Sequence, residues 1–349
     1  MTMKAKTRFA LIGLGRQAER IAAAIALSQS ASLTVVVGED VSHTLDFSKR
    51  HGGPKYFTSL ATLLKEDKKN SLFDAAFIAS PNYRHAEEAI AMLKAGKDII
   101  SEKPLAMTLR DGAAIIRVAR QTGTRGLVDF QLRQHPAILQ ARKLIAEGVV
   151  GNVRFVELHW SIGTFGEAKL PLLNRYMQWR EDPKLSGGGA VMARGVHLFD
   201  LAQFLTGKPI IGVRAYTDEK TGRRVDRDAA GILELEGGAF VSVITSKRIP
   251  EADNRVTLYG ERGRIKLPNV FLENVPGLLE LKTEKGTHVE KFAPVNLYRE
   301  LVEDFEKARR GQKTVSSTLS EGVGVIAVTE AFLTSARNGK AVPVRKFKF

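Results

Sequence analysis

The sequence has 349 residues, of which 44% are hydrophobic and 26% charged, and 53 Lys and Arg against 38 Asp and Glu give a net charge of +15. It contains no cysteine, which excludes disulfides, thiolate nucleophiles and cysteine-bound metal centres. A chain of this length and composition predicts a globular protein of about two domains.

The beginning of the sequence and its apolar runs bear on location. The stretch "MTMKAKTRFALIGLG" passes directly into a strand and a glycine turn, without the apolar region and cleavage site of a secretory signal. Apolar runs such as "LTVVV" and "DAAFIA" are far shorter than the ~20 residues that a membrane span needs. We therefore expect a cytoplasmic protein with no membrane partner.

The excess of basic residues raises nucleic-acid binding as a hypothesis. The cations are scattered and often neighbour acids, as in "KEDKK", "DEKTGRR" and "EDFEKARR". No helix-turn-helix, zinc-finger or RNA-binding signature accompanies them. A solvated basic surface, or attraction of an anionic cofactor or substrate, explains the charge better, and we expect no nucleic-acid partner.

Strand and helix patterns alternate over residues 1–128. Short apolar or β-branched runs predict strands at 8–15, 33–38, 73–80, 97–104 and 124–130, and helical spacing predicts helices at 17–30, 43–52, 84–96 and 109–123. This alternation is typical of a Rossmann domain, an α/β fold with a doubly wound parallel sheet.

The pattern changes over residues 129–349. After a helix at 136–148, strand-like stretches follow one another at 210–218, 229–237, 239–247, 255–267 and 278–292, separated by turns such as "EGG", "GERG" and "EKG". Helical patterns follow at 298–311 and 320–339. We expect an α+β domain with a large, mostly antiparallel open sheet and helices on one face.

A glycine-rich turn, "GLGRQA" at 13–18, links the first strand to the first helix. Gly13 permits the tight turn, and Gly15 lets the backbone of Arg16 and Gln17 approach a pyrophosphate at the helix N-terminus. Ala18 replaces the third glycine, where only close helix–strand packing is required. In this context the motif predicts dinucleotide binding, whereas alone it could be a turn without function.

The end of the second strand bears on NAD against NADP. Gly38 stands where an NAD-selecting carboxylate is usual, which leaves room for a 2′-phosphate, and Glu39 follows it. Glu39 would repel such a phosphate unless Arg16, His43 or Lys49 compensated it. The choice between NAD and NADP stays open.

Several segments together resemble one family. They are "SPNYRHAEEAIAMLKAGKDIISEKPLA" at 80–106, "GNVRFVELHW" at 151–160 and "WREDPKLSGGGAVMARGVHLFDLAQFLTG" at 179–207. They resemble the glucose-fructose oxidoreductase, inositol dehydrogenase and rhizopine-catabolism (Gfo/Idh/MocA) family over nearly the whole chain. The resemblance implies hydride transfer between NAD or NADP and a sugar, cyclitol or related polyol or carbonyl compound. It also implies a homo-oligomer formed through the second sheet.

The resemblance also assigns residues. It places beside the cofactor Ser80, Pro81, Asn82, His85, Glu102, Lys103 and Gln131, and it places Arg133 at the substrate. The peptide before Pro104 is commonly cis in the family, which aims Lys103 at the reacting centre.

Physical chemistry separately favours a catalytic Lys103. A lysine between a buried strand and a proline has little freedom, and its ammonium could stabilise the alkoxide that develops during hydride transfer. A lysine paired with Glu102 or a backbone carbonyl at the sheet edge is the structural alternative.

His197 lies on an apolar helix at 191–205 and occupies the family's catalytic histidine position. The family usually has an aspartate four residues earlier, whereas this sequence has Ala193. Asp200, one turn further on, could orient His197 or pair within the core. We expect His197 to contact the substrate and to meet Lys103, from the other domain, over the redox ring.

Three further residues are candidates near the substrate, and two hypotheses compete with the enzyme. Arg194 could bind a substrate carboxylate or phosphate, and Trp179 and Arg180 could line the pocket. The histidines are not spaced as metal ligands, and we expect no metal. The change to Ala193 keeps open a catalytically reduced protein that only binds nucleotides or sugars, and the net charge keeps open a nucleic-acid-binding protein.

Overall fold

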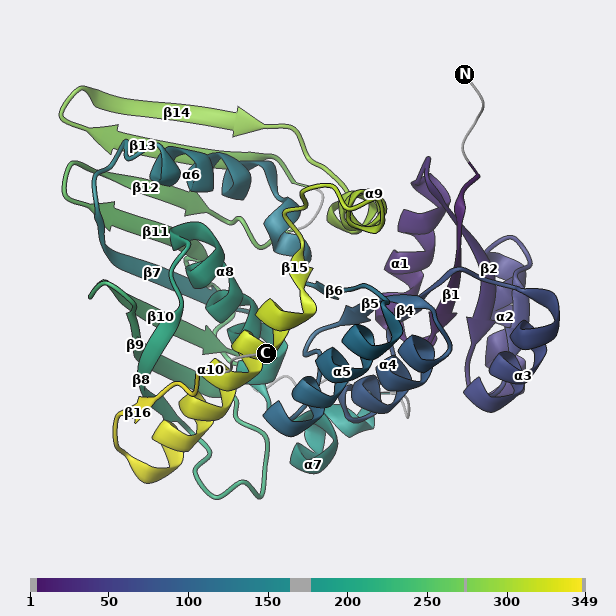
Figure 1. Ribbon diagram of the computed structural model, residues 1–349. Helices are drawn as coiled ribbons and strands as arrows, with labels where there is room; N and C mark the ends of the chain where they lie inside the picture. The colour runs from purple at the N-terminus through teal and green to yellow at the C-terminus, as the bar shows by residue number, and fades with distance from the viewer. Residues whose placement is uncertain (1–4, 164–176, 273–274, 347–349) are drawn as a thin grey trace. The chain divides into compact units, whose positions relative to one another are not determined.

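The computed structural model describes residues 5–163, 177–272 and 275–346, and the chain divides into two compact units. Unit 1 comprises residues 1–131 and 296–323, and unit 2 comprises residues 132–295 and 324–348. The sequence places residues 296–323 after the second sheet, but in space they pack with the first one (Figure 1).

Unit 1 is a seven-stranded sheet in the order β15-β6-β5-β4-β1-β2-β3. All its neighbouring strands are parallel except β15, which is antiparallel to β6. The strands are β1 (Thr7–Ile12), β2 (Ala31–Val37), β3 (Lys55–Phe57), β4 (Ala75–Ile78), β5 (Asp98–Glu102), β6 (Gly126–Asp129) and β15 (Ser317–Thr318). The predicted doubly wound parallel sheet is confirmed.

Helices cover this sheet because each has one buried apolar face. They are α1 (Arg16–Leu27), α2 (Val41–Arg50), α3 (Leu60–Asn70), α4 (His85–Lys94), α5 (Leu109–Thr122) and α9 (Leu297–Arg309). Helix α9 packs beside α1, and the Phe305 ring lies 5.5 Å from that of Phe9 on β1. Strand β3 and helix α3 were not predicted from the sequence.

Unit 2 is a nine-stranded sheet in the order β14-β13-β12-β11-β7-β10-β9-β8-β16. Its strands are β7 (Val153–Ser161), β8 (Ile210–Thr217), β9 (Asp228–Leu235), β10 (Phe240–Ser246), β11 (Arg255–Gly260), β12 (Gly263–Pro268), β13 (Gly277–Thr283), β14 (Gly286–Phe292) and β16 (Val342–Pro343). Among the described strands of this second sheet, β7 and β10 form the one parallel pair, and all other neighbouring strands are antiparallel. The predicted, mostly antiparallel sheet is confirmed.

Helices of unit 2 lie on one face of its sheet (Figure 1): α6 (Pro136–Ala146), α8 (Val196–Thr206) and most of α10 (Leu319–Asn338). A short π-helical segment, η4 (Val191–Gly195), precedes α8, and the short helix α7 (Pro183–Ser186) packs against η3 (Gln178–Glu181). Among the described residues, α10 alone is long and apolar enough to cross a membrane. Of its 18-residue apolar stretch, 67% is buried inside the protein.

Candidate functional site

The glycine-rich turn leaves open space in front of α1. Gly13 has φ +84°, and a Cβ there would lie 2.5 Å from the backbone of Ser80, so the turn packs tightly against the loop after β4. Gly15 is the N-cap of α1 and provides no side-chain cap, and a Cβ on it would meet nothing within 4 Å. Uncapped N–H groups facing open space fit an anion such as a pyrophosphate.

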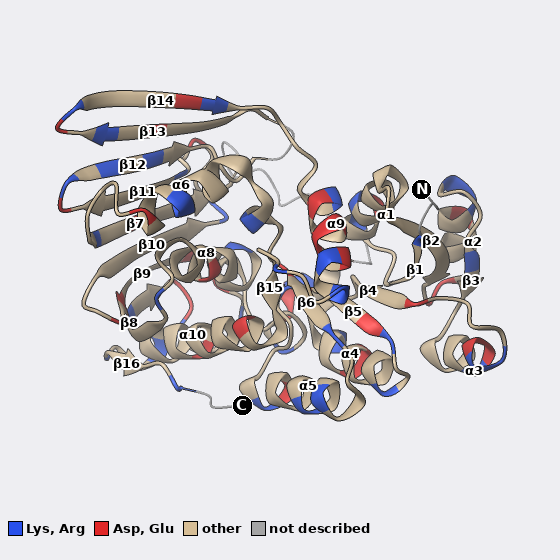
Figure 2. Ribbon diagram, turned by 45° about the horizontal axis from the view of Figure 1, so that its top comes forward, with Lys and Arg blue, Asp and Glu red and all other residues tan. Residues whose placement is uncertain are grey.

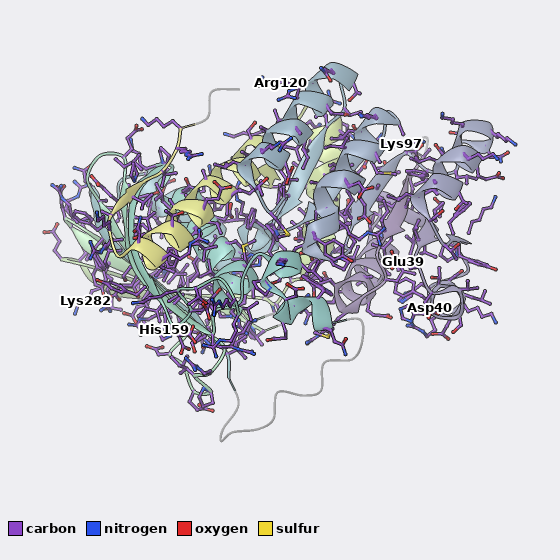
Figure 3. All side chains as sticks on the ribbon, turned by 90° about the horizontal axis from the view of Figure 1, so that it is seen from below. Glu39, Asp40, Lys97, Arg120, His159 and Lys282 are labelled. Atoms are coloured by element: carbon purple, nitrogen blue, oxygen red, sulfur yellow. The ribbon has the colours of Figure 1, made fainter. Side chains whose placement is uncertain are left out.

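Gly38, in the loop after β2, is packed closely by two side chains. A Cβ there would lie 2.5 Å from Oγ1 of Thr44 and 2.9 Å from Cδ1 of Leu14, so a larger residue would require these side chains to move. Glu39 accepts a hydrogen bond from Arg84, a cation that the sequence did not suggest, and Asp40 caps α2 (Figure 3).

His85 ties two loops together. It is 1% exposed, and its Nδ1 and Nε2 lie 2.7 Å and 2.8 Å from the carbonyl oxygens of Pro104 and Ser80. Burial lowers the pKa of this imidazole. Because both ring nitrogens face backbone oxygens, His85 has a structural role, and its expected cofactor contact stays a prediction. The Lys103–Pro104 peptide that His85 supports is cis, as the resemblance implied.

A buried carboxyl group lies beneath the 80–82 loop. The hydroxyl of Ser80 donates to the carboxylate of Glu88, and Nε of Arg84 lies 3.0 Å from the other oxygen. Burial raises the pKa of Glu88 to about 7. Pro81 and Asn82 begin the short η1 segment (Asn82–Arg84) above this group.

A polar network joins the ends of β5 and β6 to α9. Nε2 of Gln17 donates to Glu102 (3.0 Å) and to the hydroxyl of Tyr298 (2.7 Å), and Nε2 of Gln131 donates to the same hydroxyl (3.2 Å). The structure thus joins Gln17, Glu102 and Gln131, each of which we expect to bind the cofactor, in one network. Tyr298 was missed because it is 167 residues away from Gln131 in the sequence.

Asp129 is the second residue of this network that sequence reasoning missed. It is 1% exposed and is the register partner of Glu102 on the neighbouring strand, so the two carboxyl groups lie side by side. Burial and the charge of Glu102 raise the pKa of Asp129 well above its ordinary value, whereas Lys103 lowers it. An acid inside the apolar run "GLVDF" was the available signal.

We predict that Asp129→Asn flattens the pH dependence of stability. The folded protein keeps the Asp129 proton to a higher pH than the unfolded chain does, so the wild-type free energy of unfolding falls as pH rises above about 4. Asparagine cannot lose this proton, so the free energy of unfolding of the variant should not fall in this way. Its difference from the wild-type value should grow by up to about 1.4 kcal/mol per pH unit above about pH 4. Urea denaturation from pH 4 to 8 measures it.

The exposed acid Asp253 is the control, and Asp253→Asn should keep the wild-type slope. Parallel curves for the wild type and Asp129→Asn would contradict the protonated state of Asp129.

In unit 2, α8 is held by a buried ion pair. Nε and Nη2 of Arg133 donate to both oxygens of Asp200, with a shortest distance of 2.6 Å, and the two side chains are 3% and 1% exposed. The Arg133 guanidinium also lies 4.7 Å from the centre of the Phe204 ring. Arg133 therefore has a structural role and Asp200 pairs within the core, while the expected substrate contact of Arg133 stays a prediction.

The predicted effect of Arg133→Met is a loss of about 3–5 kcal/mol in the free energy of unfolding, because Asp200 would keep a buried charge without its partner. Adding Asp200→Asn should restore part of the loss. Arg154→Met, at an exposed ion pair with Glu261, should cost less than about 1 kcal/mol. If Arg133→Met and Arg154→Met lowered the free energy of unfolding equally in denaturant titrations, the buried pair would stabilise the protein no more than the exposed one.

His197 faces an aromatic pair from the sheet. Its ring lies 5.4 Å from that of Trp160 on β7, and Trp160 stacks on Phe271 at 4.8 Å. Arg194 donates from Nη1 to the carbonyl of Ser246 at 3.2 Å. The Arg180 guanidinium lies over the ring of Trp179 at 4.7 Å, so these two candidates contact each other.

The "GGG" segment has a packing role that the sequence did not disclose. The carboxylate of Asp226 accepts from the backbone N–H of Gly189 (2.7 Å) and Val191 (2.8 Å), and a Cβ at Gly189 would overlap the Asp226 backbone. Asp226 therefore caps the helical run that carries His197. Within residues 5–163, 177–272 and 275–346, no three His, Asp or Glu side chains are grouped to hold a metal ion.

The fold and the glycine-rich turn define an oxidoreductase with a Rossmann domain for NAD or NADP. Residues 7–130 match the family model described as "Oxidoreductase family, NAD-binding Rossmann fold", and residues 142–344 match its "C-terminal alpha/beta domain". The chain belongs to the Gfo/Idh/MocA oxidoreductase family.

Relatives cover most of the chain. It is 26% identical to a 1,5-anhydro-D-fructose reductase of Ensifer adhaerens, over 85% of this chain and 86% of the relative. It is 31% identical to an inositol 2-dehydrogenase of Saccharopolyspora erythraea, over 78% and 76%. The structure of an aldose-aldose oxidoreductase from Caulobacter crescentus has a TM-score of 0.85 at 24% identity and covers 97% of this chain and 99% of that one.

Proposed function

We propose that this protein transfers a hydride between NAD or NADP and a CH–OH or carbonyl carbon of a sugar, cyclitol or related polyol. The observation that carries the proposal is the uncapped N-terminus of α1 behind Gly15, which the hydrogen bond from Gln17 to Glu102 holds beside the end of β5, directly before Lys103. The names of relatives, which include sugar and inositol dehydrogenases, support the substrate class.

Each residue has a role that the chemistry of hydride transfer requires. The N–H groups of Arg16 and Gln17 would bind the pyrophosphate, and Ser80, Pro81 and Asn82 would line the nicotinamide side. A bound nicotinamide supplies the hydride acceptor or donor. The ammonium of Lys103 would stabilise the alkoxide oxygen of the substrate and exchange a proton with it, and His197 would contact the substrate. Glu102 and Gln131 would hold the end of β5 in place through Tyr298.

The first test of this proposal uses Lys103→Met. We expect the variant to bind NADH or NADPH as tightly as the wild type, measured by nicotinamide fluorescence, and to lose at least about 100-fold in kcat on a sugar and polyol panel. Lys94→Met, at an exposed position of α4, is the matched control and should keep full activity.

The same experiment separates the alternatives. If the wild type bound none of NAD, NADH, NADP and NADPH, the proposed oxidoreductase function would be refuted. Binding without turnover of any panel member would favour a catalytically reduced protein, which Ala193 suggests.

We further propose a cytoplasmic homo-oligomer formed through the sheet of unit 2. Six large apolar side chains there are at least 36% exposed, and the strand register places them on one face, opposite to the helices: Tyr216, Ile232, Phe240, Ile244, Tyr259 and Val289. An exposed apolar face of this kind favours a protein interface over solvent. Lysines, arginines and acids alternate on α5, α9 and β14, which does not favour a nucleic-acid surface (Figure 2).

A charge in this face should dissociate the oligomer. We expect Ile232→Arg to give a monomer in light scattering at a concentration at which the wild type is a dimer or tetramer, because an arginine cannot be buried there without a partner. Leu27→Arg, at an exposed apolar position of unit 1, is the control and should keep the wild-type mass. A monomeric wild type would refute the interface.

A further inference from the structure

Two cations lie together at the start of the helix that carries His197. Arg194 belongs to η4, one turn before His197, and Lys247 follows the end of β10. The only hydrogen bond of the Arg194 side chain in the described part of the chain goes to the Ser246 carbonyl. Arg194 lies close enough to Lys247 for its charge to add to the effect of burial in lowering the pKa of that lysine.

This placement of Arg194 is costly for the folded protein. Burial lowers the pKa of Arg194 to about 10, and burial is also the main cause of a lowered pKa at Lys247. Arg194 also lies in the first turn of the helical run 191–206, where the helix dipole disfavours a positive charge. A partly buried charge that opposes local stability in this way is a candidate for a functional site.

The neighbouring carboxylates are already engaged. Glu181 pairs with Arg227 at 2.6 Å, and Asp226 accepts from the backbone of η4. Asp228 pairs with Arg248 and accepts from the Ser246 hydroxyl. Within the described residues, neither Arg194 nor Lys247 has a carboxylate within 4 Å. The more distant charges of Glu181 and Asp226 favour the protonated form of Lys247 but do not outweigh its burial.

The surroundings of these cations can bind a hydroxylated ligand. Thr245 is 1% exposed, and its hydroxyl has no hydrogen-bond partner among the described residues. It is the register partner of Trp160 on the parallel strand β7, so both side chains are on the face of the sheet where Trp160 contacts His197. A free hydroxyl, an imidazole and an aromatic ring therefore share this face with Arg194.

We propose that the substrate of this protein carries an oxyanion, a carboxylate or a phosphate ester, which Arg194 and Lys247 bind beside the CH–OH group that reacts. The inference rests on the proposed function for the reaction itself, but it concerns the ligand class. Against the described residues, four of the five guanidinium N–H groups of Arg194 make no hydrogen bond and can form a forked contact with the anion. Sugar acids and sugar phosphates supply such an anion, whereas neutral sugars bring no negative charge to the two cations.

A binding experiment tests the ligand class without turnover. Thermal unfolding and calorimetric titration compare D-glucose, D-glucitol and myo-inositol with D-glucuronate, D-gluconate, D-galacturonate and D-glucose 6-phosphate. We expect at least one anionic compound to bind about 10- to 100-fold more tightly than its neutral parent, which is the range for hydrogen bonds to a charged group. The carboxylate and phosphate compounds show which oxyanion the site takes.

Variants assign the effect to the two cations. Arg194→Met should reduce the preference for the anion at least tenfold and raise the melting temperature of the ligand-free protein by a few degrees, because it removes a partly buried charge that has no carboxylate within 4 Å among the described residues. Lys247→Met should reduce the preference less. The matched control Arg223→Met, at an exposed loop position with the same charge change, should leave the preference unchanged.

Three outcomes decide between the proposals. Equal affinity for anionic and neutral compounds, or equal effects of Arg194→Met and Arg223→Met, overturns the inference. Turnover of neutral sugars with no anion preference also overturns it, while the oxidoreductase function stands. An anion preference that requires Arg194, without turnover and without nicotinamide binding, supports the inference while the oxidoreductase function fails.

Discussion

The buried ion pair between Arg133 and Asp200 is the interaction on which the candidate substrate site depends. Both groups are almost fully removed from water, so each requires the other to offset the cost of desolvation. The pair fixes how α8 is turned about its own axis. In this orientation the ring of His197 lies against Trp160, and Arg194 contacts the end of β10. It also explains why Asp200 belongs to the core of unit 2.

Unit 1 follows a related principle with carboxyl groups. Parallel strands bring their carboxyl ends to one edge of a sheet, so Glu102 and Asp129 become neighbours although 27 residues separate them. Two adjacent acids in a dry environment cannot both be charged, and a proton on Asp129 relieves the repulsion. Gln17, Gln131 and Tyr298 complete the hydrogen bonding of this edge, which keeps Lys103 between a fixed strand and a fixed proline.

The candidate site residues differ in how far the protein itself uses their polar groups. Both ring nitrogens of His85 face backbone oxygens, and Arg133 is paired with Asp200. Arg194 instead has one backbone acceptor and no carboxylate within 4 Å among the described residues. Likewise Gly38 and Gly189 are glycines because a Cβ would collide with neighbouring atoms, whereas Gly15 faces open space. The residues that keep unused binding capacity are those to which the proposals assign a ligand.

The sequence by itself determined most of the strands and helices, the two kinds of sheet, the glycine turn and the cis Lys103–Pro104 peptide, because these follow from local periodicity, from turn chemistry and from a family signature. Only the tertiary structure decided that residues 296–323 join unit 1, that Arg84 engages Glu39 and that Asp200 pairs with Arg133. These partners are 45 or more residues apart, and burial and charge select among many possible pairs only after the chain has folded.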